Sequence, residues 1–339
     1  MNGLIFRNDA SLHHDTGQHP ERIKRIVAVE KQLEAQGWCG YKVVDSPLAS
    51  ETELLRAHSP RLLEQVRTAS EQSLPLDPDT PTVPASFRAA LAGAGGAVAL
   101  VDALCGGVCD VGASLHRPPG HHAESDRSMG FCLFNNVAVA ALAAIEQHGL
   151  DRVLIFDWDV HHGNGTDEIF AADPRVCFIS VHQSPCYPMT GAFDEQGVGE
   201  GHGYTINCPV PPGSGDALWL GLVEELVVPV IEIYKPQLIL LSAGFDAHVD
   251  DPLAECTVSD AGFEAIAGAI RRVADRQAVP VGLVLEGGYD IDALARSVAL
   301  TLQQLRLADG LSASFGAVPS LVSELAAPVL SRPVFSRQL

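Results

Sequence analysis

The stretch RVLIFDWDVHHGNGT, residues 152–166, carries the feature that decides the fold, because an almost uninterrupted apolar run at 152–156 passes directly into polar residues. Apolar runs without alternation are typical of parallel strands covered on both faces, and their alternation with helices indicates an α/β fold. The sequence therefore predicts a central, mostly parallel sheet with helices on both faces. The other predicted strands are 111–115, 176–181, 204–208, 237–242 and 281–285, and the predicted helices are about 84–104, 135–148, 164–172, 215–234, 259–276 and 291–306.

The organisation of the chain favours a single domain over residues 1–339. Strand–helix units continue on both sides of each Pro- or Gly-rich stretch, so these stretches are expected to be loops and not linkers. A further helix is expected after Pro20, with Ile23, Ile26, Val27 and Leu33 as its apolar stripe. The last stretch, 310–339, is expected to wrap the surface.

Composition and charge exclude several classes of protein. The chain is 47% hydrophobic, which excludes global disorder. Its 22 Lys+Arg and 42 Asp+Glu give a net charge of −20, which argues against a nucleic-acid partner and is compatible with cationic substrates such as lysine side chains or polyamines. The eight cysteines include no C-x-x-C pair, and no run of 18 apolar residues occurs. A cytoplasmic protein without a membrane span is expected, and its oligomeric state is left open.

Polar residues follow the ends of four predicted strands. In open α/β sheets, ligands bind at the carboxyl ends of the strands. The sequence therefore predicts that these polar segments converge on one rim and form a site there. The segments are HRPPGHH at 116–122, DWDVHH at 157–162, AGFDAH at 243–248 and EGGY at 286–289.

The pattern Asp157-x-Asp159-x-His161 predicts a metal site. In an extended segment these residues project to one side, and two carboxylates facing one point are costly unless a cation neutralises them. Together with Asp246 from another strand end, Asp159 and His161 give the mixed oxygen and nitrogen ligands of a catalytic zinc site with an open position. The same ligands also permit Mn or Fe(II). Asp157 could instead orient a histidine.

Other polar and aromatic residues are candidates for acid–base work and for substrate binding. His121 and His122 follow a rigid Pro-Pro-Gly turn and are interpreted as acid–base groups whose protonation is held apart. Tyr289 follows two glycines that can aim its phenol at a developing oxyanion. Phe131 and Tyr187 either line an apolar slot or pack in the core.

Five ordered motifs resemble the zinc-dependent histone deacetylase superfamily, which also contains bacterial deacetylase-like amidohydrolases and acetylpolyamine amidohydrolases. The motifs are RPPGHHAE at 117–124, GFCLFNN at 130–136, DWDVHHGNGT at 157–166, SAGFD at 242–246 and LEGGY at 285–289. The match runs from about residue 15 to residue 296, and DWDVHHGNGT resembles the class II branch. The resemblance implies an arginase-like α/β fold and hydrolysis of N-acetyl-lysine amides to acetate and a free amine.

The resemblance also implies roles for individual residues. Zn²⁺ would bind Asp159, His161 and Asp246. His122 would be the general base and acid, with His121 as its electrostatic partner and Asp157 orienting His121. Asn164 stands where class I relatives have an Asp beside the second histidine, and Tyr289 matches the transition-state tyrosine.

Further positions match the family's substrate, channel and cation sites. Gly130, Phe131 and Tyr187 match the acyl-lysine tunnel, Arg25 an internal channel, and Asp79 a rim residue that grips the substrate backbone. One K⁺ site would use Asp157, Asp159, His161, Ser180 and Val181, and a second would use Phe170, Asp173, Val176 and Tyr204.

Three alternatives to a lysine deacetylase are open. An acetylpolyamine amidohydrolase would share every catalytic residue, although Leu253 stands where glutamate-gated polyamine relatives carry Glu and lysine deacetylases carry an apolar residue. A ureohydrolase with two Mn²⁺ would share the fold, but the segment after Phe245 reads Asp246-Ala-His248 and not Asp-x-Asp. A non-catalytic acyl-lysine-binding protein is the remaining alternative.

Overall fold

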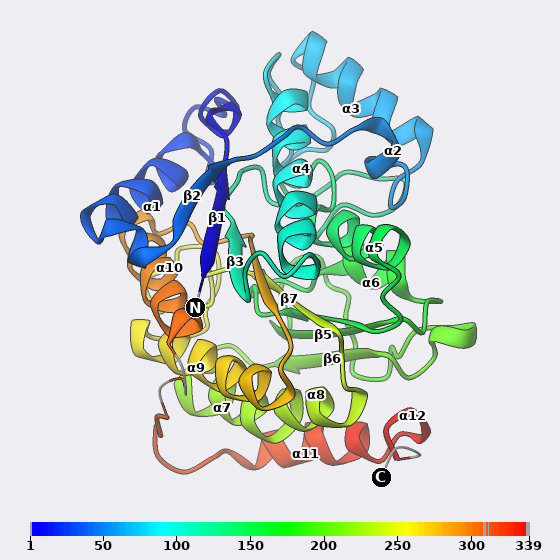
Figure 1. Ribbon diagram of the computed structural model, residues 1–339, viewed down its shortest axis with the longest axis vertical. Coiled ribbons are helices and arrows are strands. Elements are labelled where there is room, and N and C mark those ends of the chain that lie inside the picture. The colour runs from blue at the N-terminus through cyan, green and yellow to red at the C-terminus, as the bar shows by residue number, and fades with distance from the viewer. Residues whose placement is uncertain (1, 308–309, 311, 337–339) are drawn as a thin grey trace.

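A single eight-stranded sheet forms the centre of the molecule in the computed structural model, which describes residues 2–307, 310 and 312–336 (Figure 1). The strand order is β2-β1-β3-β8-β7-β4-β5-β6, and every pair of neighbours is parallel. The predicted α/β class is therefore confirmed. The strands are β1 (Gly3–Arg7), β2 (Lys42–Asp45), β3 (Val111–Ser114), β4 (Val153–Asp157), β5 (Val176–Gln183), β6 (Thr205–Val210), β7 (Leu238–Ala243) and β8 (Val281–Leu285).

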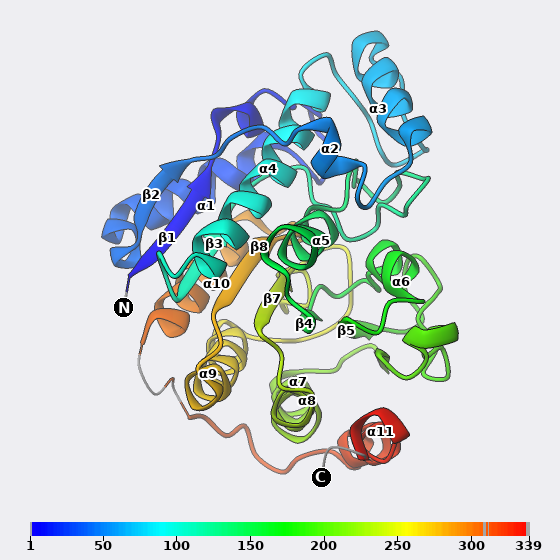
Figure 2. The ribbon, with the colours of Figure 1, turned by 45° about the vertical axis from the view of Figure 1, so that its right-hand side comes forward.

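Helices cover both faces of the sheet (Figure 2). α4 packs against α5 on one face, whereas α1, α10 and α9 pack in succession on the other. The helices are α1 (Ile23–Ala35), α2 (Glu51–Leu54), α3 (Pro60–Gln72), α4 (Ser86–Cys105), α5 (Asn136–His148), α6 (Asn164–Phe170), α7 (Asp216–Leu222), α8 (Val228–Tyr234), α9 (Asp260–Gln277), α10 (Ile291–Arg306), α11 (Ser320–Leu330) and α12 (Pro333–Ser336). A π-helical turn, Val223–Val227, joins α7 to α8, and short 3-10 helices lie at Asp9–Leu12, Gly37–Gly40 and Gly199–Gly201.

Two hydrophobic cores result, one on each face, because successive side chains of a strand point to opposite sides. In β4, Leu154 and Phe156 belong to the core under α7–α10, whereas Val153 and Ile155 belong to the core under α4 and α5. All four side chains are fully buried. This explains the uninterrupted apolar runs from which the strands were predicted.

Several elements were not predicted from the sequence. β1 and β2 add two strands at one edge of the sheet, and β2, with the sequence KVVD, is only half-buried. α2 and α3 lie in the stretch before the predicted helix 84–104. Within the segment 310–339, the described residues 310 and 312–336 include α11, which was not predicted and whose Val322 and Val329 are fully buried against the core. Within α1, Val27 is exposed and Val29 takes the expected place on the buried side.

Helix α4 is long and apolar enough to cross a membrane by length and composition alone. In this fold two thirds of its apolar window is buried inside the molecule. Its contacts with α5, β3 and β1 account for that composition by core packing.

A buried carboxylate, Glu21, ties the segment before α1 to two loops at the carboxyl end of the sheet. Its oxygens accept two hydrogen bonds from Arg117, at 2.7 and 2.6 Å, and one from Arg25 at 3.1 Å. Arg25 in turn donates to the carbonyls of Glu286 and Gly288, both at 2.6 Å. Burial raises the pKa of Glu21, but the charge of Arg117 outweighs it, and the pKa falls from its ordinary 4.5 to about 2.

We expect Glu21→Gln to destabilise the fold by about 3–5 kcal/mol, because it leaves buried guanidinium charges without their counterion. The exposed pair Arg276–Glu232 provides a control, since Glu232→Gln should change the stability by less than about 1 kcal/mol. Urea unfolding measures both. The wild-type contribution of Glu21 is complete above about pH 4.5 and is lost as the pH falls toward 2, since the folded-state pKa is the lower one. Equal effects of the two substitutions at pH 7 would contradict this account.

Candidate active site

The four strand ends singled out from the sequence lie next to one another in the sheet. β3, β8, β7 and β4 are consecutive neighbours, although β3 and β8 are far apart along the chain. Because all of them are parallel, their carboxyl ends open at the same edge, and the four polar segments that follow meet there. The predicted convergence on one rim is therefore confirmed.

Asp159, His161 and Asp246 form a buried cluster that can hold a metal ion. Their ligand atoms all lie within 4.8 Å of one another. His161 Nδ1 is 3.1 Å from Asp159 Oδ1 and 3.2 Å from Asp246 Oδ2. Backbone donors hold both carboxylates: Gly287 N–H donates to Asp159 Oδ2 and Val160 N–H donates to Asp246 Oδ1, both at 2.8 Å.

The cluster forms for a different reason from the one predicted. Strand β4 ends at Asp157, so residues 157–161 are not one extended segment. Two turns hold them instead: Asp159 N–H donates to Asp157 Oδ1 at 3.1 Å, and His161 N–H donates to Asp159 Oδ1 at 3.0 Å. An Asp side chain that accepts from the N–H two residues later forms a turn. Two such turns in succession place the side chains of Asp159 and His161 on the same side of the segment.

The cluster fits a small cation because the surrounding backbone approaches it closely. A Cβ atom at Gly287 would overlap the carboxylates of both Asp246 and Asp159, and one at Gly244 would overlap Asp159. Two carboxylates and an imidazole at these distances are the donors that zinc takes in catalytic sites. The donor set and the space around it are thus consistent with a single bound cation.

Two adjacent histidines beside the cluster have different partners. The rings of His121 and His122 are 4.0 Å apart. His121 Nδ1 lies 3.0 Å from Asp157 Oδ2, whereas His122 Nδ1 lies 2.8 Å from Asn164 Oδ1. The orienting contact predicted for Asp157 is present, as is the contact predicted for Asn164.

These partners separate the protonation of the two rings. Burial lowers the pKa of His121, but the charges of Asp159 and Asp157 outweigh it and raise the pKa to about 10. Burial also lowers the pKa of His122, and here the neighbouring His121 and His161 add to the effect, so the pKa lies well below its ordinary value. The pKa values of the two rings are thus shifted in opposite directions, which is how paired titratable groups come to take separate acid and base roles.

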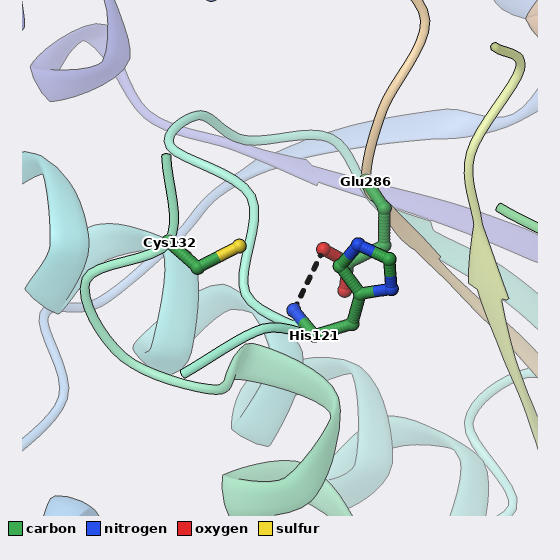
Figure 3. A group of neighbouring side chains, drawn as sticks. All are labelled: His121, Cys132 and Glu286. Carbon is green, nitrogen blue, oxygen red and sulfur yellow. Dashed lines mark hydrogen bonds between the residues drawn. The ribbon is translucent and has the colours of Figure 1, made fainter. Parts of the chain in front are cut away.

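Glu286 holds the loop that carries both histidines (Figure 3). Its Oε2 atom accepts hydrogen bonds from the backbone N–H groups of Gly120, at 2.6 Å, and His121, at 3.1 Å. Burial raises the pKa of Glu286 to about 7, although the charge of His121 opposes the rise. His121, Cys132 and Glu286 are a second group close enough to hold a metal. Because His121 Nδ1 and Glu286 Oε2 already have partners, we assign this group to loop positioning.

A cavity of about 400 Å³ opens above the metal cluster and the histidines. His122, His161 and Tyr289 lie among its lining residues. Burial raises the pKa of Tyr289, so its hydroxyl keeps its proton, although Arg25 opposes the shift. The predicted lining residues Gly130, Phe131, Tyr187, Leu253 and Asp79 all face this cavity, together with His19 and Pro20.

The walls of the cavity are aromatic. The ring of Phe131 meets Tyr289 edge to face at 5.6 Å, and the ring of Tyr187 meets His122 at 5.1 Å. Gly130 allows this approach, because its φ of +56° is unfavourable for other residues and a Cβ would overlap the His122 ring. Phe131 and Tyr187 therefore line a slot, the first of the two alternatives that the sequence left open.

The residues proposed for K⁺ lie together in the fold. Asp157 and Ser180 are paired in neighbouring strands β4 and β5. In the second group, the carbonyls of Phe170, Asp173 and Tyr204 accept backbone hydrogen bonds from Asp173, Val176 and Phe178, at 2.9, 3.3 and 3.0 Å. Each of these carbonyl oxygens has a second lone pair, so the backbone hydrogen bonds do not prevent it from also binding K⁺. The K⁺ sites stay a prediction.

Sequence reasoning missed several residues that build the site. Glu21 and Glu286 hold its loops, and His19 lies edge to face on Phe131 at 4.5 Å. Glu286 directly follows the buried strand β8, and a polar residue at that place indicates a site at the carboxyl end of the sheet, as it did for Asp157 and Asp246. Nothing local marks Glu21, because its main partner Arg117 is 96 residues away in the sequence.

Comparison with known proteins agrees with the fold and the site. The family model described as "Histone deacetylase domain" matches residues 19–305. The "Histone deacetylase-like amidohydrolase" of Pseudomonas aeruginosa is 41% identical over 295 residues, which cover 85% of this chain and 76% of that protein. "Histone deacetylase 14, chloroplastic" of Arabidopsis thaliana is 37% identical, with 92% of this chain and 78% of that protein covered. The crystal structure of the HDA15 HD domain superimposes with a TM-score of 0.88 at 33% identity, and the match covers 97% of this chain and 93% of that one.

The fold and the site are those of an α/β class of amide-hydrolysing proteins, and the chain belongs to the histone deacetylase family. It is a hydrolase that acts on amides, with deacetylase or amidohydrolase activity. The fold is the arginase/deacetylase-like α/β fold that the resemblance implied. The ureohydrolase and the non-catalytic binding protein are thereby set aside.

The tight backbone around the cluster leads to a test of the metal site. We expect Gly287→Ala to abolish stoichiometric zinc binding, because the new methyl group would displace the carboxylates of Asp159 and Asp246. Elemental analysis after dialysis against zinc measures this. Gly107→Asn is the control, since asparagine tolerates the positive φ of +68° at that position and a Cβ there would have nothing within 4 Å. Full zinc occupancy in the Gly287 variant would show that the cation binds elsewhere.

Proposed function

We propose that the protein is a zinc-dependent deacylase that hydrolyses the amide of N-acetyl-lysine in proteins or peptides. The observation that carries the proposal is the shared cavity: His122, Tyr289 and the metal cluster's His161 all line one aromatic-walled space of about 400 Å³. A narrow apolar slot suits the four-methylene stem of a lysine, and the polar groups lie where its acyl end would sit.

The metal ligands in this proposal are Asp159, His161 and Asp246. When bound, Zn²⁺ would polarise the acyl carbonyl and lower the pKa of water beside it. The backbone bonds from Gly287 and Val160 orient the two carboxylates before any cation binds. The same proposal includes K⁺ at one or both of the predicted sites. One of these sites adjoins Asp157.

Proton transfer falls to His122. Its Nδ1 faces Asn164, which leaves Nε2 for the cavity, and its depressed pKa keeps the ring neutral and able to accept a proton. In the proposed reaction His122 takes a proton from the attacking water, and a protonated histidine then delivers a proton to the leaving amine. His121, held charged by Asp157 and Asp159, supplies a fixed positive charge next to it.

Tyr289 stabilises the charge that develops on the acyl oxygen. Its N–H donates to Asp251 Oδ2 at 2.6 Å, and its ring packs against Phe131, so the phenol is fixed before substrate arrives. Preorganised donors of this kind contribute because they cost no rearrangement during the reaction.

Tyr289→Phe tests this mechanism. We expect kcat on an acetyl-lysine peptide to fall by about 10²–10³-fold, as happens when one oxyanion donor is removed. KM should change little, because the hydroxyl acts on the transition state more than on the ground state. An unchanged kcat would exclude the hydroxyl from the reaction.

Acetylpolyamine hydrolysis is the second candidate, and acidic residues near the cavity favour it. Asp79 lines the cavity, Asp250 is exposed close to Leu253, and the net charge of the chain is −20. Against it, Leu253 itself lines the cavity with an apolar side chain. A second ammonium group would need a charged partner there, and a neutral peptide would not.

A panel of substrates separates the two candidates. We expect a higher kcat/KM for acetyl-lysine peptides than for acetylated putrescine, cadaverine or spermidine. Leu253→Glu should shift selectivity toward the polyamines, because it adds a charge contact for them and a desolvation penalty for neutral chains. A wild-type preference for a polyamine by about tenfold, equivalent to about 1.4 kcal/mol, would overturn the lysine assignment.

A further inference from the structure

Glu124 stands behind the His122–Asn164 pair, at the edge of a second cavity. Asn164 Oδ1 lies 2.8 Å from His122 Nδ1, and Asn164 Nδ2 donates to Glu124 Oε1 at 2.9 Å. The other contacts of Asn164 Nδ2, with the His122 carbonyl and with Met129 Sδ, are both 3.5 Å long. Glu124 and Asn164 both line this second cavity, of about 430 Å³, whereas His122 lines the substrate cavity.

The chemistry of an asparagine makes this contact consequential. Its amide is an acceptor at one end and a donor at the other, and a rotation by about 180° exchanges the two. An ionised carboxylate accepts at both oxygens, so it binds the amine end of Asn164 and repels the carbonyl end. We propose that Glu124 is a positioning residue that fixes the Asn164 amide and so keeps the His122 proton on Nδ1, with the lone pair of Nε2 toward the substrate.

The backbone holds the two partners in place. Glu124 N–H donates to the carbonyl of Arg127 at 2.9 Å, and the carbonyl of Glu124 pairs with His58 Nδ1 at 3.0 Å. On the other side, the first turn of α6 is fixed to the histidine loop, because Gly165 N–H donates to the His121 carbonyl at 3.0 Å. A Cβ at Gly165 would overlap the Ala123 carbonyl, so the two segments are packed as closely as their backbones allow.

The need for an orienting partner arises from the residue at position 164. An aspartate there would be an acceptor at both oxygens, and it would direct the His122 proton to Nδ1 in either rotation. Asparagine does so in only one rotation. In the opposite rotation its amine would face His122, which favours a proton on Nε2 and removes the lone pair that the proposed reaction uses.

The kinetic test uses the zinc-loaded enzyme and an acetyl-lysine peptide, and it rests on the proposed function. Glu124→Gln should lower kcat by about 10-fold with KM unchanged, since glutamine can face either end of the Asn164 amide. Glu168→Gln is the matched control. It removes the same charge from the same cavity, but Glu168 accepts from Ser125 and not from Asn164, so kcat should not change.

A double substitution isolates the orienting role. In an Asn164→Asp background the amide is gone, and adding Glu124→Gln should cause no further loss of kcat. An equal loss in both backgrounds, or an equal loss in Glu168→Gln, would overturn the proposal, because Glu124 would then act through charge or general packing.

A measurement that needs no turnover keeps this inference separate from the proposed function. The ¹⁵N shifts of the His122 ring report its tautomer. We expect a proton on Nδ1 alone in the wild type and a mixture of tautomers in Glu124→Gln. A wild-type proton on Nε2, or an unchanged ratio in the variant, would overturn the role of Glu124. If the wild type hydrolyses no acyl-lysine, the proposed function is overturned instead. The tautomer measurement then still tests the role of Glu124.

Discussion

Four carboxylates are buried together at the carboxyl end of the sheet, and the rest of the site depends on how their repulsion is relieved. Asp157, Asp159, Asp246 and Glu286 all expose 1% or less of their surface. Burial alone penalises every one of these charges. Such a group persists only if cations and hydrogen-bond donors surround it. His121 provides a positive charge when protonated, and a metal cation held by Asp159, His161 and Asp246 would provide the other.

Backbone donors provide most of the remaining compensation, and this explains the glycines of the site. Asp159 accepts from Gly287 and Glu286 accepts from Gly120, so peptide N–H groups must come within hydrogen-bond distance of buried side chains. At Gly120 a Cβ would overlap the backbone of Asn136, and at Gly287 it would overlap two carboxylates. The motifs that identify the family are therefore also the segments whose peptide N–H groups donate hydrogen bonds to the buried carboxylates.

The sequence predicted the middle of the sheet and the residues that react, but not the outer strands or the support of the site. Central strands such as 152–156 are apolar on both faces and easily recognised, whereas β2 (Lys42–Asp45) is a half-buried edge strand with a charge at each end. Asp159, His161 and Asp246 stand in short patterns directly after strands, so local reasoning reached them. Their support is non-local: Arg25 bonds the carbonyl of Gly288 across 263 residues, and only the order of the strands brings the two together.

The two adjacent histidines show how far neighbours determine chemistry. His121 and His122 are consecutive in the chain, both buried, and their ring centroids are 4.0 Å apart, so burial does not distinguish them. The difference comes from what surrounds each ring: the charges of Asp159 and Asp157 raise the pKa of His121, whereas His122 Nδ1 faces an amide that carries no charge. The charged ring then lowers the pKa of its neighbour further. Two consecutive buried rings thus acquire pKa values shifted in opposite directions, because the charges around them differ.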